Sequence, residues 1–353
     1  MRKTSLAQGP TPDSESTDRK RLQMADIARL AGVSVATVSR ALSGSTLVNA
    51  ETRERIQQLA QSLNYSINLG AQNLRLQKNL TVGVVVPYDA QSRQHISDPF
   101  FLSIIGSIAD ALTDHGYDML LSRVDSERLD AASQLYDSGK VIGVIIIGQW
   151  RHHDQLNQLA ARNMPLVVWG GELPQQLYCS VGGDNRNGGE QATAHLLRAG
   201  RKRIAFLGDT ALPEVWLRRE GYLRAHTAAG LPPPPPELQI PAPFEPDAAH
   251  PILEHLCTSG VAFDGVVACS DLLAIHMVQA LRAHGRSVPG DVGVVGYDDM
   301  PLAAFCEPAL TTVHQPVLEA GTELVAALLQ LLNGVRALPR TLPVHMVVRA
   351  SAP

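Results

Sequence analysis

The sequence predicts an α/β protein in which a small all-α head precedes two doubly wound lobes built on parallel sheets. Three observations lead to this prediction. The chain has 353 residues and is 45% hydrophobic, which suffices for two or three domains with sizeable cores. Residues 22–65 have the apolar spacing of short helices. From Leu80 onward, short apolar runs alternate with longer amphipathic segments, as in β-α-β units.

Charge is divided unevenly along the chain. Residues 1–80 contain 11 Lys and Arg against 6 Asp and Glu, whereas residues 81–353 contain 19 against 28. A basic head on an acidic body indicates that the head, and not the body, meets a polyanion such as nucleic acid.

The composition also excludes two classes of protein. A chain this rich in apolar residues is not disordered as a whole. Its longest clean apolar run, residues 141–147, is far shorter than the roughly 20 residues that cross a bilayer. The N-terminus has no apolar leader segment, so we expect a cytoplasmic protein.

The strongest local pattern lies in the head. Ile27 and Ala31 are four residues apart on one face of a first helix, and Val38 and Ala41 are three apart on a second. Gly32 lies between the two helices, where a sharp turn needs a positive φ. This arrangement predicts a helix-turn-helix.

Capping residues support the same three-helix head. Ser34 stands where the second helix needs an N-cap. Asn49 is the expected N-cap of a third helix that continues to Leu63, with Glu51 in its first turn.

In a helix-turn-helix, the second helix lies in the major groove of DNA. Arg40 can pair bidentately with guanine, while Val35 and Ala36 allow close approach or touch a thymine methyl. Hydroxyl and amide side chains nearby suit phosphates, although any one of them can instead be a cap or plain surface. The expected DNA contacts of the head are Ser34, Val35, Ala36, Thr37, Ser39, Arg40 and Asn49.

Eight apolar runs in the body have the length and flanking turn residues of buried strands. They lie at residues 81–87, 118–124, 143–148, 166–169, 204–208, 265–269, 292–296 and 310–314. Because amphipathic segments separate these runs, we expect right-handed crossovers and parallel sheets. The body is too long for one open sheet, so we expect two lobes.

The chain resembles the lactose-repressor (LacI/GalR) family of bacterial transcription regulators. The resemblance is strongest at residues 24–42 and extends over roughly residues 22–350. It implies a homodimer on a pseudo-palindromic operator and a body of the periplasmic-sugar-binding type, with a small effector in the cleft between its lobes.

The resemblance also implies the division of the chain. We expect a disordered tail at 1–20, a helix-turn-helix domain at 21–65, a hinge helix at 66–79, an effector-binding and dimerisation domain at 80–353, a first lobe at about 80–178 and 308–335, and a second lobe at about 179–307 and 336–353.

By the same resemblance, Asn68 and Leu74 of the hinge contact DNA, with Leu74 as an apolar wedge in the minor groove. Two residues depart from the family pattern. Ile67 replaces the usual proline, and Gly70 lowers helix stability by up to ~1 kcal/mol. We therefore expect this helix to fold only on DNA.

Candidate effector contacts follow the ends of the predicted strands, where ligands bind in open α/β sheets. Asp98, Arg218 and Asp298 match motifs that contact the effector in the family. A forked guanidinium and carboxylates suit sugar hydroxyls, while caps and surface ion pairs are the alternatives. Trp150 and Trp169 follow strands and can stack on a sugar ring or pack in a core. The expected effector contacts are Asp98, Phe101, Trp169, Arg218, Phe244, Ser270 and Asp298.

Two further positions depart from the family. Ser270 stands where asparagine is common, and Gly170 where aspartate is frequent. Both changes are expected to remove polar groups from around the ligand. We therefore expect a sugar or a sugar derivative, without carrying over lactose, galactose or a purine.

Nothing in the sequence indicates an enzyme. It has no dinucleotide, Walker or serine-hydrolase motif. His152 and His153 are adjacent and cannot face one metal ion from a helix. The glycine-rich stretch at 182–189 looks like a phosphate loop, but in the family it is an inter-lobe crossing that starts a helix. We expect no catalytic residue, no metal and no cofactor.

Several alternatives stay open. The effector can act as an inducer or as a corepressor. A transporter's solute-binding protein or a sugar-processing enzyme would share the two-lobed body, but neither would use a DNA-binding head. A dimer is favoured over a tetramer because the chain stops soon after its last expected strand.

Overall fold

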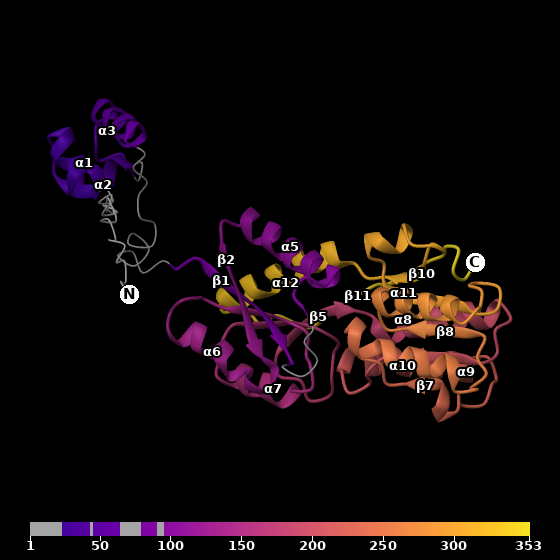
Figure 1. The fold of residues 1–353 in the computed structure, drawn as a ribbon. Helices are drawn as coiled ribbons and strands as arrows, with labels where there is room; N and C mark the ends of the chain where they lie inside the picture. The colour runs from indigo at the N-terminus through magenta and orange to yellow at the C-terminus, as the bar shows by residue number, and fades with distance from the viewer. Residues whose placement is uncertain (1–22, 43–44, 64–78, 90–94) are drawn as a thin grey trace, which may run out of the picture. The chain divides into compact units, whose positions relative to one another are not determined.

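The computed structural model describes residues 23–42, 45–63, 79–89 and 95–353 (Figure 1). The chain divides into two compact units, Met1–Lys78 and Asn79–Pro353. The expected tail at 1–20 and the expected hinge contacts Asn68 and Leu74 lie outside the described residues. Among the described helices, none combines the length and the apolar character needed to cross a membrane.

The head contains the three expected helices, α1 (Met24–Ala31), α2 (Val35–Leu42) and α3 (Ala50–Ser62). Gly32 has a φ of 64°, as the predicted turn requires. The Ser34 hydroxyl accepts a hydrogen bond from the Thr37 amide at 3.1 Å, and the Asn49 side chain accepts one from the Thr52 amide at 2.8 Å. Both predicted caps are therefore confirmed.

A small apolar core holds these helices together. Its buried members come from all three helices and the turn before α3, and they are Ile27, Ala28, Val38, Ala41, Val48 and Ile56. The Arg55 guanidinium adds a tie by donating to the Ala31 carbonyl at 3.1 Å. The face of α2 that carries Val38 is thus fixed inward, which leaves its opposite face outward.

The body contains two six-stranded sheets, one in each lobe. In spatial order, the first sheet is β11 (Arg340–Leu342), β5 (Cys179–Gly183), β4 (Leu166–Trp169), β3 (Val144–Ile147), β1 (Thr81–Tyr88) and β2 (Asp118–Asp125). The second is β12 (His345–Val347), β10 (Thr311–His314), β9 (Gly293–Asp298), β8 (Gly265–Ala268), β6 (Ile204–Leu207) and β7 (Gln239–Ile240).

All eight predicted strands are present, and the predicted parallel sheets are confirmed apart from one edge. β12 pairs with β10 in antiparallel fashion. Four strands were not predicted, namely β5, β7, β11 and β12. Three of these have only two or three residues, and β5 contains two glycines, so none stands out as an apolar run.

Helices cover both faces of each sheet. The helices are α5 (Pro99–Asp114), α6 (Asp130–Asp137), α7 (His153–Ala161), α8 (Asn185–Arg198), α9 (Pro213–Ala228), α10 (Pro246–Thr258), α11 (Asp271–Ala283) and α12 (Val317–Leu332). Short 3-10 turns lie at Ser126–Arg128, Pro236–Leu238 and Pro301–Ala304. In the first lobe, α5 and α12 pack on one face and α6 and α7 on the other (Figure 1). In the second lobe, α10 and α11 oppose α8 and α9.

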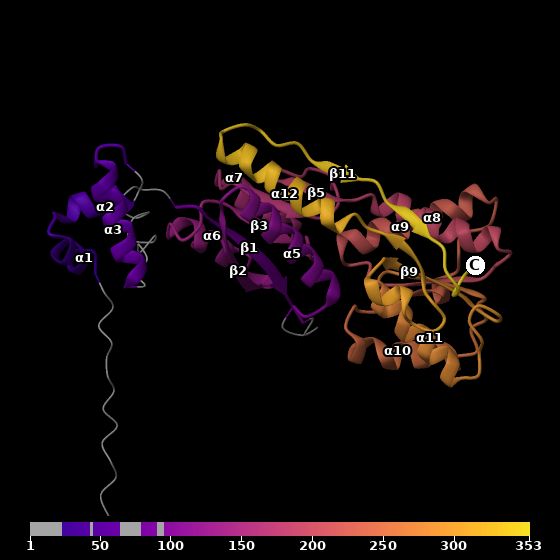
Figure 2. The ribbon, with the colours of Figure 1, turned by 90° about the horizontal axis from the view of Figure 1, so that it is seen from above.

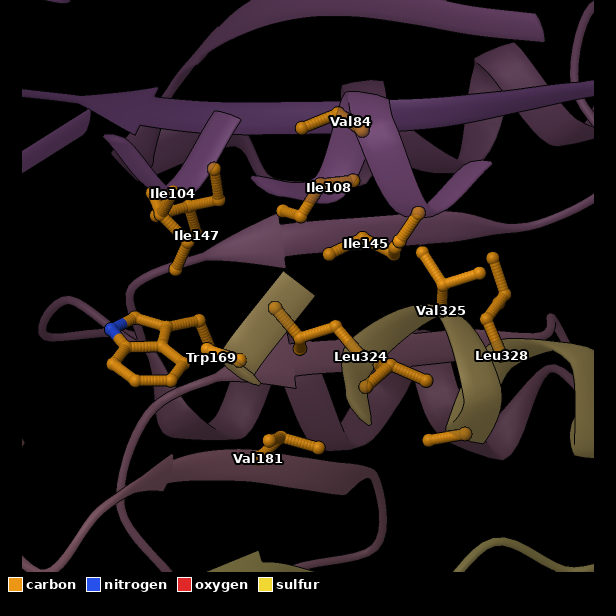
Figure 3. Close-up of a cluster of buried hydrophobic side chains, with 14 of the residues drawn as sticks. Val84, Ile104, Ile108, Ile145, Ile147, Trp169, Val181, Leu324, Val325 and Leu328 are labelled. Atoms are coloured by element: carbon orange, nitrogen blue, oxygen red, sulfur yellow. The ribbon is translucent and has the colours of Figure 1, made fainter. Parts of the chain in front are cut away.

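The larger core of the first lobe lies between its sheet and helices α5 and α12 (Figure 3). Side chains of the strands, such as Ile145 and Val181, meet Leu324 and Leu328 of α12. Trp169 lies at the edge of this core, where β4 ends. The continuous apolar runs of the strands are thus explained by burial on both faces of the sheet.

The chain crosses between the lobes three times, after β5, after β10 and after β11. The last crossing is the yellow segment that runs from the first lobe into the second in Figure 2. The expected lobe boundaries were wrong for these three strands. β5 and β11 belong to the first sheet and β10 to the second, because each pairs within that sheet before the chain leaves it.

Glycines let α8 and α9 lie close together. A Cβ on Gly189 would stand 2.0 Å from the Arg218 carbonyl oxygen, and one on Gly221 would stand 1.9 Å from that of Arg186. Asp184 caps α8 by accepting from the Asn187 amide at 3.0 Å. The glycine-rich stretch therefore begins a helix and serves helix packing, as the interpretation of an inter-lobe crossing predicts.

We predict opposite effects for two glycine-to-alanine substitutions. Gly221→Ala should lower the free energy of unfolding by about 1–3 kcal/mol or more, because its methyl group has no room against the α8 backbone. Gly106→Ala, inside α5 with no neighbour within 4 Å, should raise it by up to ~1 kcal/mol. Urea denaturation of both variants checks this, and equal tolerance of the two would contradict the close helix crossing.

Candidate functional site

A cleft between the two lobes brings together all seven expected effector contacts. They are Asp98, Phe101, Trp169, Arg218, Phe244, Ser270 and Asp298. The cleft has an empty volume of about 660 Å³, part of which is open to solvent. Most of its lining follows the carboxyl ends of strands in both sheets, which is where parallel sheets place ligand sites. The volume suits a small organic molecule.

Aromatic side chains form the first-lobe wall of this cleft. The Phe100 ring lies 5.8 Å from that of Phe101 and 6.3 Å from that of Trp169, measured between centroids. Phe101 and Trp169 are also buried members of the first-lobe core, so the wall is rigid. Phe100 and Trp150 line the cleft as well, although the sequence did not single out Phe100.

Arg218 projects from α9 and is only 7% exposed. Its Nε donates to the Asn185 side chain at 2.9 Å, and its Nη1 donates to the Cys269 carbonyl. The guanidinium carbon lies 3.7 Å from the centre of the Tyr297 ring, which stabilises the cation. These contacts fix the plane of the group, so Nη2 is the donor that Arg218 can offer to a bound molecule.

Asp298 ends β9 with a φ of 113°, an unusual conformation for a residue with a side chain. Its carboxylate accepts a hydrogen bond from the side-chain amide of Gln315 at 2.7 Å. Burial raises the pKa of Asp298 to about 7, against the opposing effects of Arg218 and Gln315. Gln315 directly follows β10, so the rule that ligand contacts follow strand ends could have found it, but the prediction did not include it.

A second carboxyl group lies beneath the cleft. Asp271 is fully buried and accepts hydrogen bonds from the Thr312 hydroxyl at 2.5 Å and the Met300 amide at 2.8 Å. Burial, and then the charge of Asp298, raise the pKa of Asp271 well above its ordinary value. Because the charge of Asp298 raises the pKa of Asp271, the protonation of these two carboxyl groups is coupled.

Glu214 joins the lobes across the cleft. It lies in the first turn of α9 and accepts a hydrogen bond from the Gln149 backbone amide of the first lobe at 3.1 Å. Burial raises the pKa of this carboxyl group above its ordinary value. No pattern in the sequence indicated Glu214, because an acidic residue in a first helical turn is commonplace.

The expected consequence of Gly170 was wrong, because Gly170 does not line the cleft. A Cβ there would stand 2.5 Å from the Gln149 side chain. That side chain is fully buried, accepts from the Gly171 amide at 3.0 Å and donates to the Tyr178 hydroxyl at 2.9 Å. Gly170 therefore makes room for a polar network behind the cleft.

Two polar cleft residues are also helix caps. Ser270 accepts from the Leu273 amide at 3.2 Å at the start of α11, and Asp98 accepts from the Phe100 amide at 2.9 Å at the start of α5. A hydroxyl and a carboxylate each have more than one lone pair, so a capping group of either kind can also contact a ligand. The capping alternative and the binding alternative are thus compatible at both positions.

Six of the seven expected DNA contacts of the head lie on α2 or directly before it, from Ser34 to Arg40, and the seventh, Asn49, caps α3. Ser34, Val35, Ala36 and Arg40 are exposed, whereas Thr37 and Ser39 are half-buried. Val35 is 42% exposed, which is unusual for a valine in so small a core and leaves an apolar spot on the outer face of α2. Such a surface suits close approach to bases.

Comparisons with known proteins match both the head and the body of the chain. Residues 23–68 match the family described as bacterial regulatory proteins, lacI family, and residues 193–352 match the periplasmic binding protein-like domain. The chain is 32% identical to the HTH-type transcriptional regulator CelR of Thermobifida fusca over 343 residues, which span 94% of this chain and 99% of that protein.

Two solved structures resemble the whole chain. The complex of the regulator CelR with cellobiose aligns with a TM-score of 0.70 at 31% identity, over 94% of this chain and 100% of the other. The lac repressor dimer bound to operator and the anti-inducer ONPF aligns with a TM-score of 0.83 at 25% identity, over 94% and 99% of the two chains.

We predict that Asp298→Asn changes how stability depends on pH. The folded-state pKa is raised from its ordinary value of 3.8, so between about pH 4 and pH 7 the folded chain binds the Asp298 proton more tightly than the unfolded chain does. The stability contributed by this proton is present at low pH and is lost as pH rises through the raised pKa. The stability of the variant relative to wild type should therefore increase between pH 4 and pH 8, by on the order of 1–3 kcal/mol.

Urea denaturation at each pH from 4 to 8 measures this difference. Asp271 is retained in both proteins, but the charge of Asp298 helps to raise its pKa, so the difference reports Asp298 together with its effect on Asp271. A difference that stays constant over the whole range would contradict the raised pKa.

Proposed function

The chain belongs to the LacI family of bacterial regulatory proteins and is a DNA-binding transcriptional regulator, and we propose that a neutral sugar held between its lobes controls its affinity for operator DNA. One observation carries this proposal. A single cleft places the anchored Arg218 and Asp298 opposite the aromatic wall of Phe100 and Trp169. Hydroxyl-binding groups facing aromatic rings suit the two faces of a sugar.

The charges of the cleft favour a neutral ligand. Three carboxyl groups line it, those of Asp98, Glu214 and Asp298, against the single cation Arg218. An anionic ligand would meet these acidic groups and would find only one cation, itself already bonded to protein acceptors. A neutral sugar can instead bond to these groups in either state, because its hydroxyls donate to a carboxylate and accept from a protonated carboxyl group. Sugar phosphates are thus disfavoured.

Control of DNA binding follows from the position of the cleft. Residues of both lobes line it, and the lobes are joined by three crossing segments, so a ligand that contacts both lobes shifts their relative positions. By linkage, the operator must change effector affinity by the same factor as the effector changes operator affinity. This reciprocity holds for an inducer and for a corepressor.

The head is the proposed reader of the operator. Arg40 supplies the guanine contact, Val35 and Ala36 approach the bases, and the hydroxyls and amide of α2 and its flanks hold phosphates. One helix-turn-helix reads a short half-site, so two copies of the chain are needed for a pseudo-palindrome. The similarity to a repressor dimer bound to operator supports this assembly.

A thermal-shift screen tests the effector class first. It compares neutral mono- and disaccharides with sugar phosphates and nucleobases. A ligand at 100 times its Kd stabilises the folded chain by about 2.7 kcal/mol, which raises the melting temperature by several degrees. We expect hits among neutral sugars alone. Hits confined to anionic ligands or nucleobases, or no hit at all, would refute the proposed effector.

With the effector identified, two neighbouring arginines give a matched comparison. Arg218→Lys should weaken effector binding at least about tenfold, because lysine cannot reproduce the forked, stacked geometry. Arg219→Lys, whose guanidinium donates to the Gln239 side chain outside the cleft, should leave effector affinity within about twofold. Isothermal titration calorimetry measures both, and equal losses would argue against the assigned role of Arg218.

We also predict the effect of Arg40→Lys on operator recognition. The substitution keeps the charge but loses the bidentate fork, so binding to an operator selected from random duplexes should weaken by about 1–3 kcal/mol. Preference should relax at one base pair in each half-site, while the salt dependence stays nearly constant. Arg29→Lys, at an exposed site on α1, serves as the control. Unchanged preference at every base pair would exclude base readout by Arg40.

A further inference from the structure

We propose that the cleft contains a second subsite, so that the effector is a neutral oligosaccharide of at least two rings. The inference rests on the sugar effector proposed above and specifies its size. It starts from a second pocket that adjoins the first and has an empty volume of about 490 Å³. Trp150, Leu212 and Phe244 line both pockets, so the two pockets meet at these three side chains.

The topology places this second pocket at one end of the cleft. Its lining follows β1, β2 and β3 of the first sheet and β6 and β7 of the second. β2 and β7 are the outer strands of the two sheets, on the opposite side from β11 and β12 and their crossing. A ligand that starts at Arg218 and extends past Trp150 therefore runs away from the crossing segments, along the length of the cleft.

The chemistry of the second pocket suits sugar hydroxyls. Glu127 and His152 lie 3.2 Å apart on the first-lobe side. Arg151 of the first lobe pairs with Asp209 of the second, and Glu245 adds another carboxyl group. Both donors and acceptors thus line the pocket, in contrast to the aromatic wall of the first subsite. A sugar ring has hydroxyls on its rim to bond with both kinds of group.

Trp150 marks the boundary between the two subsites. Its φ of 50° is the left-handed conformation, which is strained for so bulky a residue. The neighbouring Gly148 leaves room for the indole, since a Cβ there would stand 3.2 Å from the Trp150 Nε1. The backbone thus holds the Trp150 indole at the junction of the two pockets. There, each of its two faces can pack against one of two successive sugar rings.

The pair of Arg151 and Asp209 gives the second subsite a role in closure. It connects the lobes beside the second pocket, as Gln149 and Glu214 connect them beside the first. A second sugar ring would therefore contact both lobes and add to the free energy of closing. We expect the oligosaccharide to bind more tightly and to change operator affinity more than its monosaccharide does.

Calorimetry with matched sugar series tests the second subsite. The probes are the mono-, di- and trisaccharides of β-1,4-glucose, α-1,4-glucose, β-1,4-xylose and β-1,4-mannose, titrated into the full chain. We expect one series in which the disaccharide binds at least about tenfold more tightly than its monosaccharide. If a monosaccharide binds and its disaccharide gains less than about threefold, the second subsite is refuted while the sugar effector stands. If no sugar binds, the proposed function itself fails.

Two exposed arginines of the first lobe then locate the gain. Arg151 pairs with Asp209 at the second pocket, and Arg162 pairs with Asp137 away from the cleft, and their side chains are 53% and 51% exposed. Arg151→Ala should lower disaccharide affinity at least about threefold and leave monosaccharide affinity within twofold. Arg162→Ala should change neither. An equal loss of both affinities in Arg151→Ala, or no loss of either, would overturn the second subsite, and unliganded melting temperatures confirm that both variants are folded.

Discussion

The buried guanidinium of Arg218 is the group around which the second lobe's side of the cleft is arranged. A cation so far out of water needs acceptors and opposite charge nearby. Asn185 at the start of α8, the Cys269 carbonyl just after β8, and the Tyr297 ring and Asp298 of β9 supply them. The close crossing of α8 and α9, which Gly189 and Gly221 allow, brings Asn185 within reach. The packing of α8 on α9, the ends of β8 and β9 and the position of the Arg218 guanidinium therefore depend on one another.

The first lobe meets this charged floor with a rigid apolar wall. Phe101 and Trp169 belong to the same core that packs α5 and α12 on the sheet, so the wall is as fixed as the lobe itself. Between the lobes, the described contacts beside the cleft are polar: Gln149 with Glu214, and Arg151 with Asp209. Rigid lobes joined by polar contacts and three crossing segments can close on a ligand without repacking either core. This arrangement is suited to transmitting ligand binding to a DNA-binding head.

The head is built on a different physical basis. Its core contains only a few apolar side chains, and its helix ends are fixed by local groups: a left-handed glycine, a serine cap and an asparagine cap. The outer face of α2 does not pack in the core and is available to contact DNA, with Arg40 and Val35 exposed on it. Its positive charge also contrasts with the acidic body, so electrostatics favour DNA at the head alone.

Features of the fold that have local causes could be predicted from the sequence alone. The turn at Gly32, the caps at Ser34 and Asn49, and eight strands with continuous apolar runs all follow from residues within a few positions of one another. The motifs around Asp98, Arg218 and Asp298 predicted the core of the cleft through the family resemblance, not through local physical causes. Other features became clear only from the three-dimensional arrangement. The strand pairing shows which lobe holds β5, β10 and β11. The packing shows that Gln149 fills the space beside Gly170 and that Glu214 and Gln315 reach the cleft. These features depend on pairing and packing between residues far apart in the chain, and a short strand or a lone polar residue gives no periodic signal of its distant partner.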